Sequence, residues 1–178
     1  FIVTYHPETL SSTQDKKLKI IFKSLSSFKN CSFFFTSSGN DEGADLINKM
    51  IKNYVKSRSN MYFFKSLGQT NYFSLMKHVD GVIGNSSSGI YEVPSFKKGT
   101  VNIGDRQKGR LLSKSVINCD YEEKKIINNI KKITSNKFKI SIKKMKNLYY
   151  KKNSSSNITK TLLKFCTKSV NLKKKFHD

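Results

Sequence analysis

The 178-residue chain lacks tryptophan, has only two prolines and 12 acidic residues, and contains no long apolar run. No stretch approaches the roughly 18 apolar residues of a membrane-spanning helix, so we expect no membrane insertion. Its three cysteines, Cys31, Cys119 and Cys166, are far apart and form neither a CxxC pair nor a zinc-site spacing with histidine. We therefore expect no metal site, and free thiols in a reducing, cytoplasmic compartment.

The scarcity of acidic residues leaves a formal net charge of +22. Such a charge is typical of proteins that bind nucleic acid or another anionic surface. However, of the 34 basic residues only Arg58, Arg106 and Arg110 are arginine, and this lysine richness is also typical of an A/T-rich genome. Residues 1–120 carry net +8 and residues 121–178 carry net +14, so the excess lies mainly in the last third. The charge alone therefore does not define a function.

Short runs rich in β-branched and aromatic residues recur at regular intervals, and several are apolar on both faces, as strands of a buried parallel sheet are. Apolar residues with helical spacing lie between the first four runs. Alternation of strand and helix favours an α/β fold, with a Rossmann-like parallel sheet covered by helices on both faces. The predicted strands are residues 1–5, 31–36, 61–64, 81–84, 100–103 and 115–119.

After residue 120 the pattern predicts helices only, at 122–134, about 140–150, and 158–168. The serines at 154–156 are interpreted as a turn, with Asn157 as the cap of the last helix. Residues 169–178 form a basic tail. Because the chain opens inside a strand, we expect it to be a piece of a longer protein.

The loop at residues 84–92 is the strongest candidate for chemistry, since ligands of open α/β sheets bind beyond the carboxyl ends of the strands. Small hydroxyl residues before a helix expose backbone N–H groups to a phosphate. Glu92 lies one turn after Ser88, where a carboxylate can accept both hydroxyls of a ribose. This pattern indicates a nucleoside-diphosphate site; the alternative is a simple helix cap with a surface glutamate.

Other strand-following loops offer weaker candidates. Two of the three arginines, Arg106 and Arg110, follow the fifth strand, where the planar guanidinium suits phosphate or carboxylate; the alternative is an exposed basic loop. His6 follows the first strand and can donate to a phosphate or assist a leaving group, or serve a structural role. Backbone groups at 65–68 can meet a flat base. The loop around Asn40 reads equally as a turn and helix cap.

Four motifs together resemble the hydrolysing UDP-N-acetylglucosamine 2-epimerases, over residue 1 to about 168. That family has the GT-B fold, two Rossmann-like domains with the active site between them, and this chain is similar to the C-terminal domain. The resemblance implies a UDP-binding C-terminal domain at residues 1–168. The motifs are GNSSSGIYEVP at 84–94, NIGDRQKGR at 102–110, TYHPET at 4–9 and LMKHVDG at 75–81.

The same resemblance implies roles for individual residues of the first motif. Ser86 and Ser87, together with Ser88 and the loop at Gly89, would hold the diphosphate. Glu92 would bind the ribose hydroxyls. These implied roles agree with those suggested by the residue types alone.

The remaining roles fall on other loops. Arg106 would meet phosphate, His6 would lie beside the diphosphate as a candidate catalytic residue, and the backbone of Leu67 would contact the uracil. The family has an asparagine two residues before the aspartate of the second loop. Here Asn40 stands one residue before Asp41, so its role as a substitute is open.

The resemblance further implies a reaction in two steps without a cofactor. UDP leaves by elimination across C1–C2, and water then adds to release free N-acetylmannosamine or a diacetamido analogue. The carboxylates for this chemistry belong to the N-terminal domain, so we expect the present chain to bind UDP weakly without turnover. The complete enzyme would be a cytoplasmic homo-oligomer.

Three alternatives remain. A non-hydrolysing 2-epimerase typically carries Ser-Gly-Gly and Arg-Pro-Glu in the corresponding loops, and neither is present. A GT-B glycosyltransferase would share the nucleotide site. A basic nucleic-acid-binding module would need lysines and aromatic residues gathered on one surface, with strongly salt-dependent binding.

Overall fold

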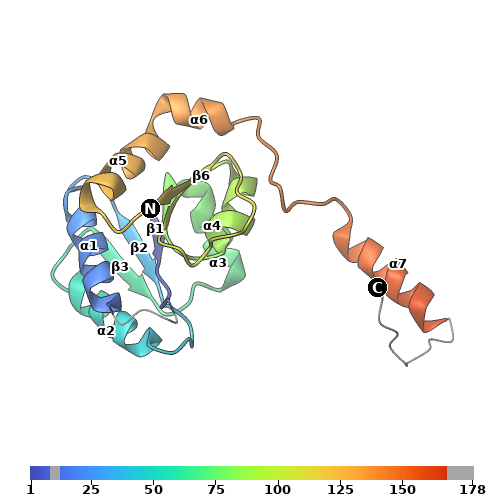
Figure 1. Cartoon of the computed structure of the whole chain (residues 1–178), viewed down its shortest axis with the longest axis horizontal. Helices are drawn as coiled ribbons and strands as arrows, with labels where there is room; N and C mark the ends of the chain where they lie inside the picture. The colour runs from blue at the N-terminus through green and yellow to red at the C-terminus, as the bar shows by residue number, and fades with distance from the viewer. Residues whose placement is uncertain (9–12, 168–178) are drawn as a thin grey trace. The chain divides into compact units, whose positions relative to one another are not determined.

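The computed structural model describes residues 1–8 and 13–167. The chain divides into two compact units, Phe1–Leu148 and Tyr149–Asp178, and the first carries the sheet (Figure 1). The basic tail expected at 169–178 lies outside the described residues. The assignment of a single UDP-binding domain up to residue 168 stays a prediction, and the first compact unit ends 20 residues earlier.

The first unit is built on a six-stranded, wholly parallel sheet with the order β3-β2-β1-β4-β5-β6. The six predicted strands are confirmed to within two residues at each end. The strand order reverses direction between β1 and β4, which is where open α/β sheets form a ligand crevice. The strands are β1 Ile2–Thr4, β2 Phe33–Thr36, β3 Met61–Phe64, β4 Gly81–Gly84, β5 Gly99–Ile103 and β6 Val116–Cys119.

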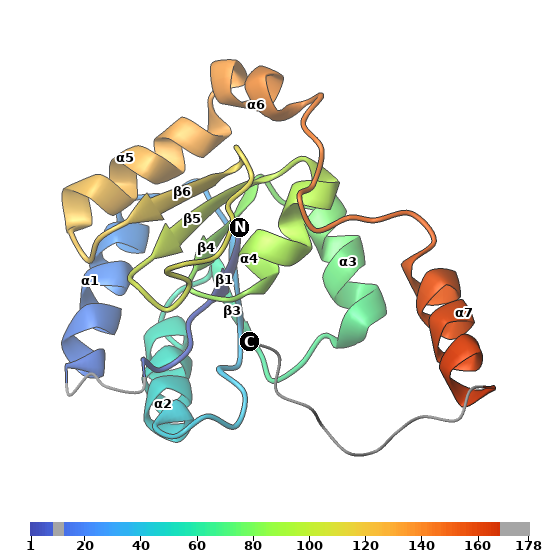
Figure 2. The same ribbon diagram turned by 45° about the vertical axis from the view of Figure 1, so that its right-hand side comes forward.

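Helices cover both faces of the sheet, as predicted (Figure 2). α1, α2, α5 and α6 bury the larger apolar core against one face, while α3 and the 3-10 helix η1 bury a smaller one against the other. Among the described residues, no helix is both long and apolar enough to cross a membrane. The helices are α1 Gln14–Ser26, α2 Ala44–Val55, α3 Gly68–His78, α4 Ser88–Tyr91, η1 Val93–Phe96, α5 Glu123–Thr134, α6 Asn136–Ile142 and α7 Ser154–Cys166.

The helix predicted at 140–150 is wrong in position, because α6 begins and ends earlier. The Ser135 hydroxyl accepts the backbone N–H of Phe138 at 3.3 Å and so caps the helix at that point. Phe138 and Ile142 are buried and fix the helix against the core. Beyond it, the Asn147 side chain donates to the carbonyl of the last residue of α4 at 2.7 Å, which holds the segment outside a helix.

The last helix is also longer at its start than predicted. α7 includes the serines at 154–156 that were interpreted as a turn, and Asn153 rather than Asn157 precedes the first turn, with a left-handed φ of 60°. Serine is common both in turns and in the first turn of a helix, so its presence did not distinguish the two structures. α7 belongs to the second compact unit, and none of its side chains is buried within the chain.

Gly89 brings the short helix α4 into close contact with β5. A Cβ built on Gly89 would lie 2.6 Å from the Cγ2 methyl of Thr100. The Thr100 hydroxyl donates to the Gly89 carbonyl at 2.8 Å, so the contact is also tied by a hydrogen bond. Since α4 follows the β4 loop directly, this packing fixes the position of that loop on the sheet.

Replacing Gly89 with alanine should lower the free energy of unfolding by about 1–3 kcal/mol, because the added methyl overpacks the contact with Thr100. Thr100→Ser removes the clashing methyl but keeps the hydroxyl. In that background we expect the Gly89→Ala penalty to shrink to less than half. Urea unfolding of the four proteins of this cycle measures the effect, and equal penalties in both backgrounds would contradict the packing argument.

Candidate functional site

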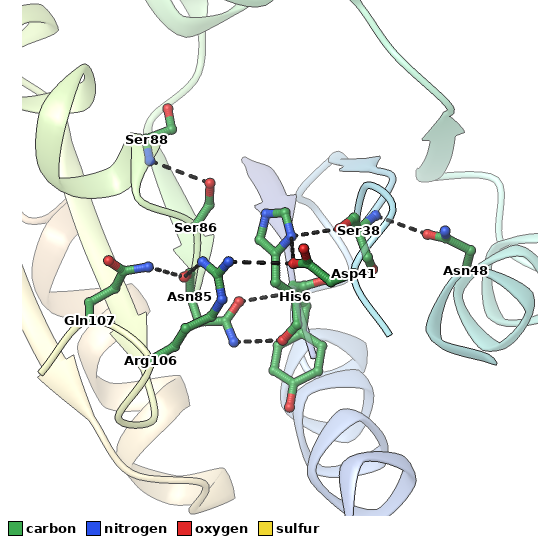
Figure 3. A network of polar contacts seen from close by, with 10 residues as sticks. His6, Ser38, Asp41, Asn48, Asn85, Ser86, Ser88, Arg106 and Gln107 are labelled. Atoms are coloured by element: carbon green, nitrogen blue, oxygen red, sulfur yellow. Dashed lines mark hydrogen bonds and ion pairs between the residues drawn. The ribbon is translucent and has the colours of Figure 1, made fainter. Parts of the chain in front are cut away.

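Asn85 joins the loops that follow three strands at the carboxyl edge of the sheet (Figure 3). It is fully buried, and its side chain pairs twice with the backbone of His6. The His6 N–H donates to Asn85 Oδ1 at 2.7 Å, and Asn85 Nδ2 donates to the His6 carbonyl at 2.8 Å. The Asn85 carbonyl in turn accepts from Gln107 at 2.6 Å and from Arg106 at 3.4 Å. The loops after β1, β4 and β5 therefore form one connected edge.

The imidazole of His6 is oriented by the loop after β2. Its Nδ1 lies 2.7 Å from the Ser38 carbonyl and 3.7 Å from the Asp41 carboxylate. A carbonyl only accepts, so this contact assigns the hydrogen to Nδ1 and leaves Nε2 as an acceptor in the neutral ring. Burial lowers the pKa of His6, and the Arg106 charge lowers it further, against the opposing effects of Ser38 and Asp41.

The guanidinium of Arg106 spans two of these loops. One nitrogen reaches the Asn85 carbonyl, and another lies 3.5 Å from the Asp41 carboxylate. The side chains of Arg106 and Asp41 are 30% and 54% exposed, so their ion pair contributes little and can open without a large cost. Arg106 is thus placed at the crevice with a fork that an anion can engage.

A cavity of about 480 Å³ opens beside this polar edge. Its lining includes Ser86, Ser88 and Glu92 from the segment after β4, and Leu67 and Tyr72 from the segment after β3. The Tyr72 hydroxyl lies 2.8 Å from Ser88 Oγ, and burial raises the pKa of Tyr72. Glu92 Oε2 is buried and has no hydrogen-bond partner among the described residues. A buried carboxylate oxygen of this kind is prepared to accept from a ligand hydroxyl.

The structure places most of the residues that the sequence indicated at this edge. Leu67, Ser86, Ser88 and Glu92 line the cavity, with Glu92 one helical turn beyond Ser88, and His6 and Arg106 belong to the adjoining polar network. Ser87 and Gly89 support the turn instead: the Ser87 carbonyl accepts two helix N–H groups, and Gly89 packs on β5.

Asn40 lies in an exposed turn, and the polar network of that loop runs through Ser38 and Asp41. Sequence reasoning missed the linking role of four residues. Asn85 carried a signal, because it directly follows a buried strand inside the strongest motif. The four residues are Asn85, Gln107, Ser38 and Asn48.

Within residues 1–8 and 13–167, no three His, Cys, Asp or Glu side chains are placed to hold a metal ion. The site consists of a cavity lined by serine hydroxyls and by Glu92 with its buried oxygen, and of an adjoining polar network that contains an arginine and a histidine. Residues 1–163 match the family UDP-N-acetylglucosamine 2-epimerase.

The chain belongs to the UDP-N-acetylglucosamine 2-epimerase family. It is 36% identical over 180 residues to polysialic acid biosynthesis protein P7 of Escherichia coli, covering 100% of this chain and 46% of that protein. It is 41% identical over 174 residues to the GDP/UDP-N,N'-diacetylbacillosamine 2-epimerase (hydrolyzing) of Campylobacter jejuni, covering 97% and 44%. The chain therefore spans about half the length of the curated relatives it matches.

Solved structures of 2-epimerases show the same fold. The UDP-GlcNAc 2-epimerase of Methanocaldococcus jannaschii, in complex with UDP-GlcNAc and UDP, matches with a TM-score of 0.70 at 14% identity. The match covers 92% of this chain and 45% of that one. The S. aureus MnaA–UDP co-structure gives a TM-score of 0.72 at 13% identity, over 93% and 44%. The expectation of a Rossmann-like half of a GT-B fold is confirmed.

Truncating Asn85 tests whether this residue holds the edge of the epimerase domain together. In Asn85→Ala the buried N–H and carbonyl of His6 lose their partners, so we expect a loss of roughly 2–4 kcal/mol in the free energy of unfolding. The matched control is Asn40→Ala in the exposed turn, expected to change stability by less than about 0.5 kcal/mol. Similar urea midpoints for the two variants would refute the linking role.

The titration of His6 tests the local electrostatics. Because its folded pKa lies below the unfolded value, His6 adds stability above the unfolded pKa, and this stability is lost as the pH falls through the folded pKa. Arg106→Gln should raise the pKa of His6, and Asp41→Asn should lower it. The control is Arg58→Gln, which lies just before the amino end of the edge strand β3 and should leave the pKa of His6 unchanged. NMR titration of the imidazole measures all four proteins, and shifts of the opposite sign would contradict the assignment.

Proposed function

We propose that this chain is the UDP-binding half of a hydrolysing UDP-N-acetylglucosamine 2-epimerase. The observation that carries the proposal is the buried oxygen of Glu92, which has no hydrogen-bond partner in the described part of the chain and lies in a cavity that Ser86 and Ser88 also line. A ribose diol offers two hydroxyl donors to such a carboxylate, and serine hydroxyls offer donors to phosphate oxygens. The family membership and the names of the relatives support the same ligand.

The nucleotide would occupy the cavity from base to diphosphate. The uracil lies against the backbone of Leu67, the ribose hydroxyls donate to Glu92, and the diphosphate lies at the loop of Ser86, Ser87, Ser88 and Gly89. Arg106 exchanges its weak ion pair with Asp41 for the phosphate, which it can engage with two parallel N–H groups. The ion pair with Asp41 thus orients the Arg106 guanidinium before the ligand binds.

In the proposed reaction UDP leaves C1 as the proton is lost from C2, and water then adds to the resulting glycal. Negative charge develops on the leaving diphosphate, and Arg106 stabilises that charge. The diphosphate also favours protonation of His6, since a nearby anion raises the pKa of an imidazole. Protonated His6 then donates from Nε2 to the departing phosphate while Nδ1 stays on Ser38.

The carboxylates that move the C2 proton are assigned to a second domain outside this sequence, and the crevice at His6 and Arg106 would face it. We place the complete enzyme in the cytoplasm as a homo-oligomer. Its sugar is an N-acetylglucosamine or diacetamido derivative, in keeping with the description of the family and the name of the Campylobacter relative.

Calorimetric titration of UDP tests the site assignment. Arg106→Ala and Glu92→Ala each remove a charged hydrogen-bond partner, so we expect UDP to bind about 5- to 150-fold more weakly, equivalent to 1–3 kcal/mol. Lys131→Ala on the exposed face of α5 removes a positive charge elsewhere and should leave the affinity within about twofold. An equal loss in Lys131→Ala would indicate non-specific attraction to a basic protein. Unchanged binding in both site variants would refute the assignment.

A further inference from the structure

A second cavity of about 430 Å³ lies between α2 and the edge strand β3. Its lining comes from one face of α2, from β3 and from the residue that follows β2. Four lysines line it: Lys49 and Lys52 on the helix, Lys56 directly after the helix, and Lys65 just after the strand. We call this cavity the lysine groove.

The described residues leave most of the charge of the lysine groove uncompensated. Asp45 is the one acidic residue in its lining, against four lysines. None of these lysines takes part in an ion pair among the described residues. Like charges gathered around a concave surface repel one another and focus a positive potential into it. The groove is therefore a place where an anion gains more than it would on the open lysine-rich surface.

The groove also offers groups that are not cationic. The Lys52 ammonium lies 5.4 Å from the centre of the Phe63 ring, so the ring steadies the lysine and forms an apolar wall. Asn48 and Asn53 add amide groups to the lining. Small-molecule sites usually have this form: a cavity of several hundred cubic ångströms with an apolar wall and a few polar groups.

We propose that the lysine groove binds a small phosphorylated anion, beside the UDP cavity rather than within it. Separate ammonium groups on flexible stems can each meet a different oxygen of a tetrahedral phosphate, as point charges rather than as a planar fork. The inference goes beyond the proposed function and does not depend on it, because it rests on the residues of the groove.

The lysine groove adjoins the candidate active site at two points. Ser37 and Lys65 line both cavities. Asn48 accepts the backbone N–H of Ser38 at 3.0 Å, and the Ser38 carbonyl in turn accepts from the His6 ring (Figure 3). An occupant of the groove thus contacts an amide that holds the loop orienting His6.

Inorganic pyrophosphate is the probe that tests the proposal. The ¹⁵N-labelled chain is titrated at constant ionic strength, with and without saturating UDP, and amide NMR shifts report which cavity fills. We expect saturable shifts at Lys49, Lys52 and Asn53 in both titrations. Lys52→Gln combined with Lys56→Gln should raise the Kd for these shifts at least tenfold.

The matched control combines Lys131→Gln with Lys132→Gln on α5, which removes the same charge far from the groove. We expect this control to change the Kd less than twofold. The proposal is overturned if the groove amides show no saturable shift, or if both double variants weaken binding equally. A failure of UDP to bind appears separately, as absent shifts at Ser86 and Ser88, so the two proposals are distinguished.

Discussion

The double hydrogen bond between the side chain of Asn85 and the backbone of His6 is the constraint on which the candidate site depends. It lies between β1 and β4, where the strand order reverses and the following loops diverge. Gly84 makes the bond possible: its φ of 132° and the missing Cβ let the chain pass against the Thr4 carbonyl, which accepts the Asn85 N–H. Loops that would otherwise separate are held as one surface.

The buried polar groups of this surface lower the stability of the fold, and apolar packing elsewhere in the domain offsets this loss. Glu92 and Gln107 each keep a buried oxygen without a partner among the described residues, and such groups destabilise a fold. Apolar cores on both faces of the sheet compensate, the larger beneath α1, α2 and α5. The stabilising apolar contacts and the polar groups of the candidate site are therefore separated, the former on the faces of the sheet and the latter at one edge. Such a division lets a site carry unpaired groups without loss of the fold.

The sequence allowed the sheet, its helical layers and the location of Ser86, Glu92 and Arg106 at one edge of the sheet to be predicted, because each signal is local. Alternating apolar runs define strands, and the loop after a strand holds the functional groups. The network through Ser38 and Asn48 could not be predicted, since its partners are brought together only by the parallel pairing of β1, β2 and β4. The error at α6 has a similar origin: buried contacts, rather than spacing alone, decide where a short helix ends.

The net charge of +22 invited a nucleic-acid interpretation, yet the cation in the polar network of the candidate site is one of only three arginines among 34 basic residues. One nitrogen of Arg106 lies 3.4 Å from the Asn85 carbonyl and another lies 3.5 Å from Asp41, so contacts with two loops orient the guanidinium. A lysine at this position has a single ammonium and lacks the two coplanar nitrogens with which Arg106 meets these two acceptors. In a chain that otherwise uses lysine, an arginine at this crevice is explained by geometry rather than by charge.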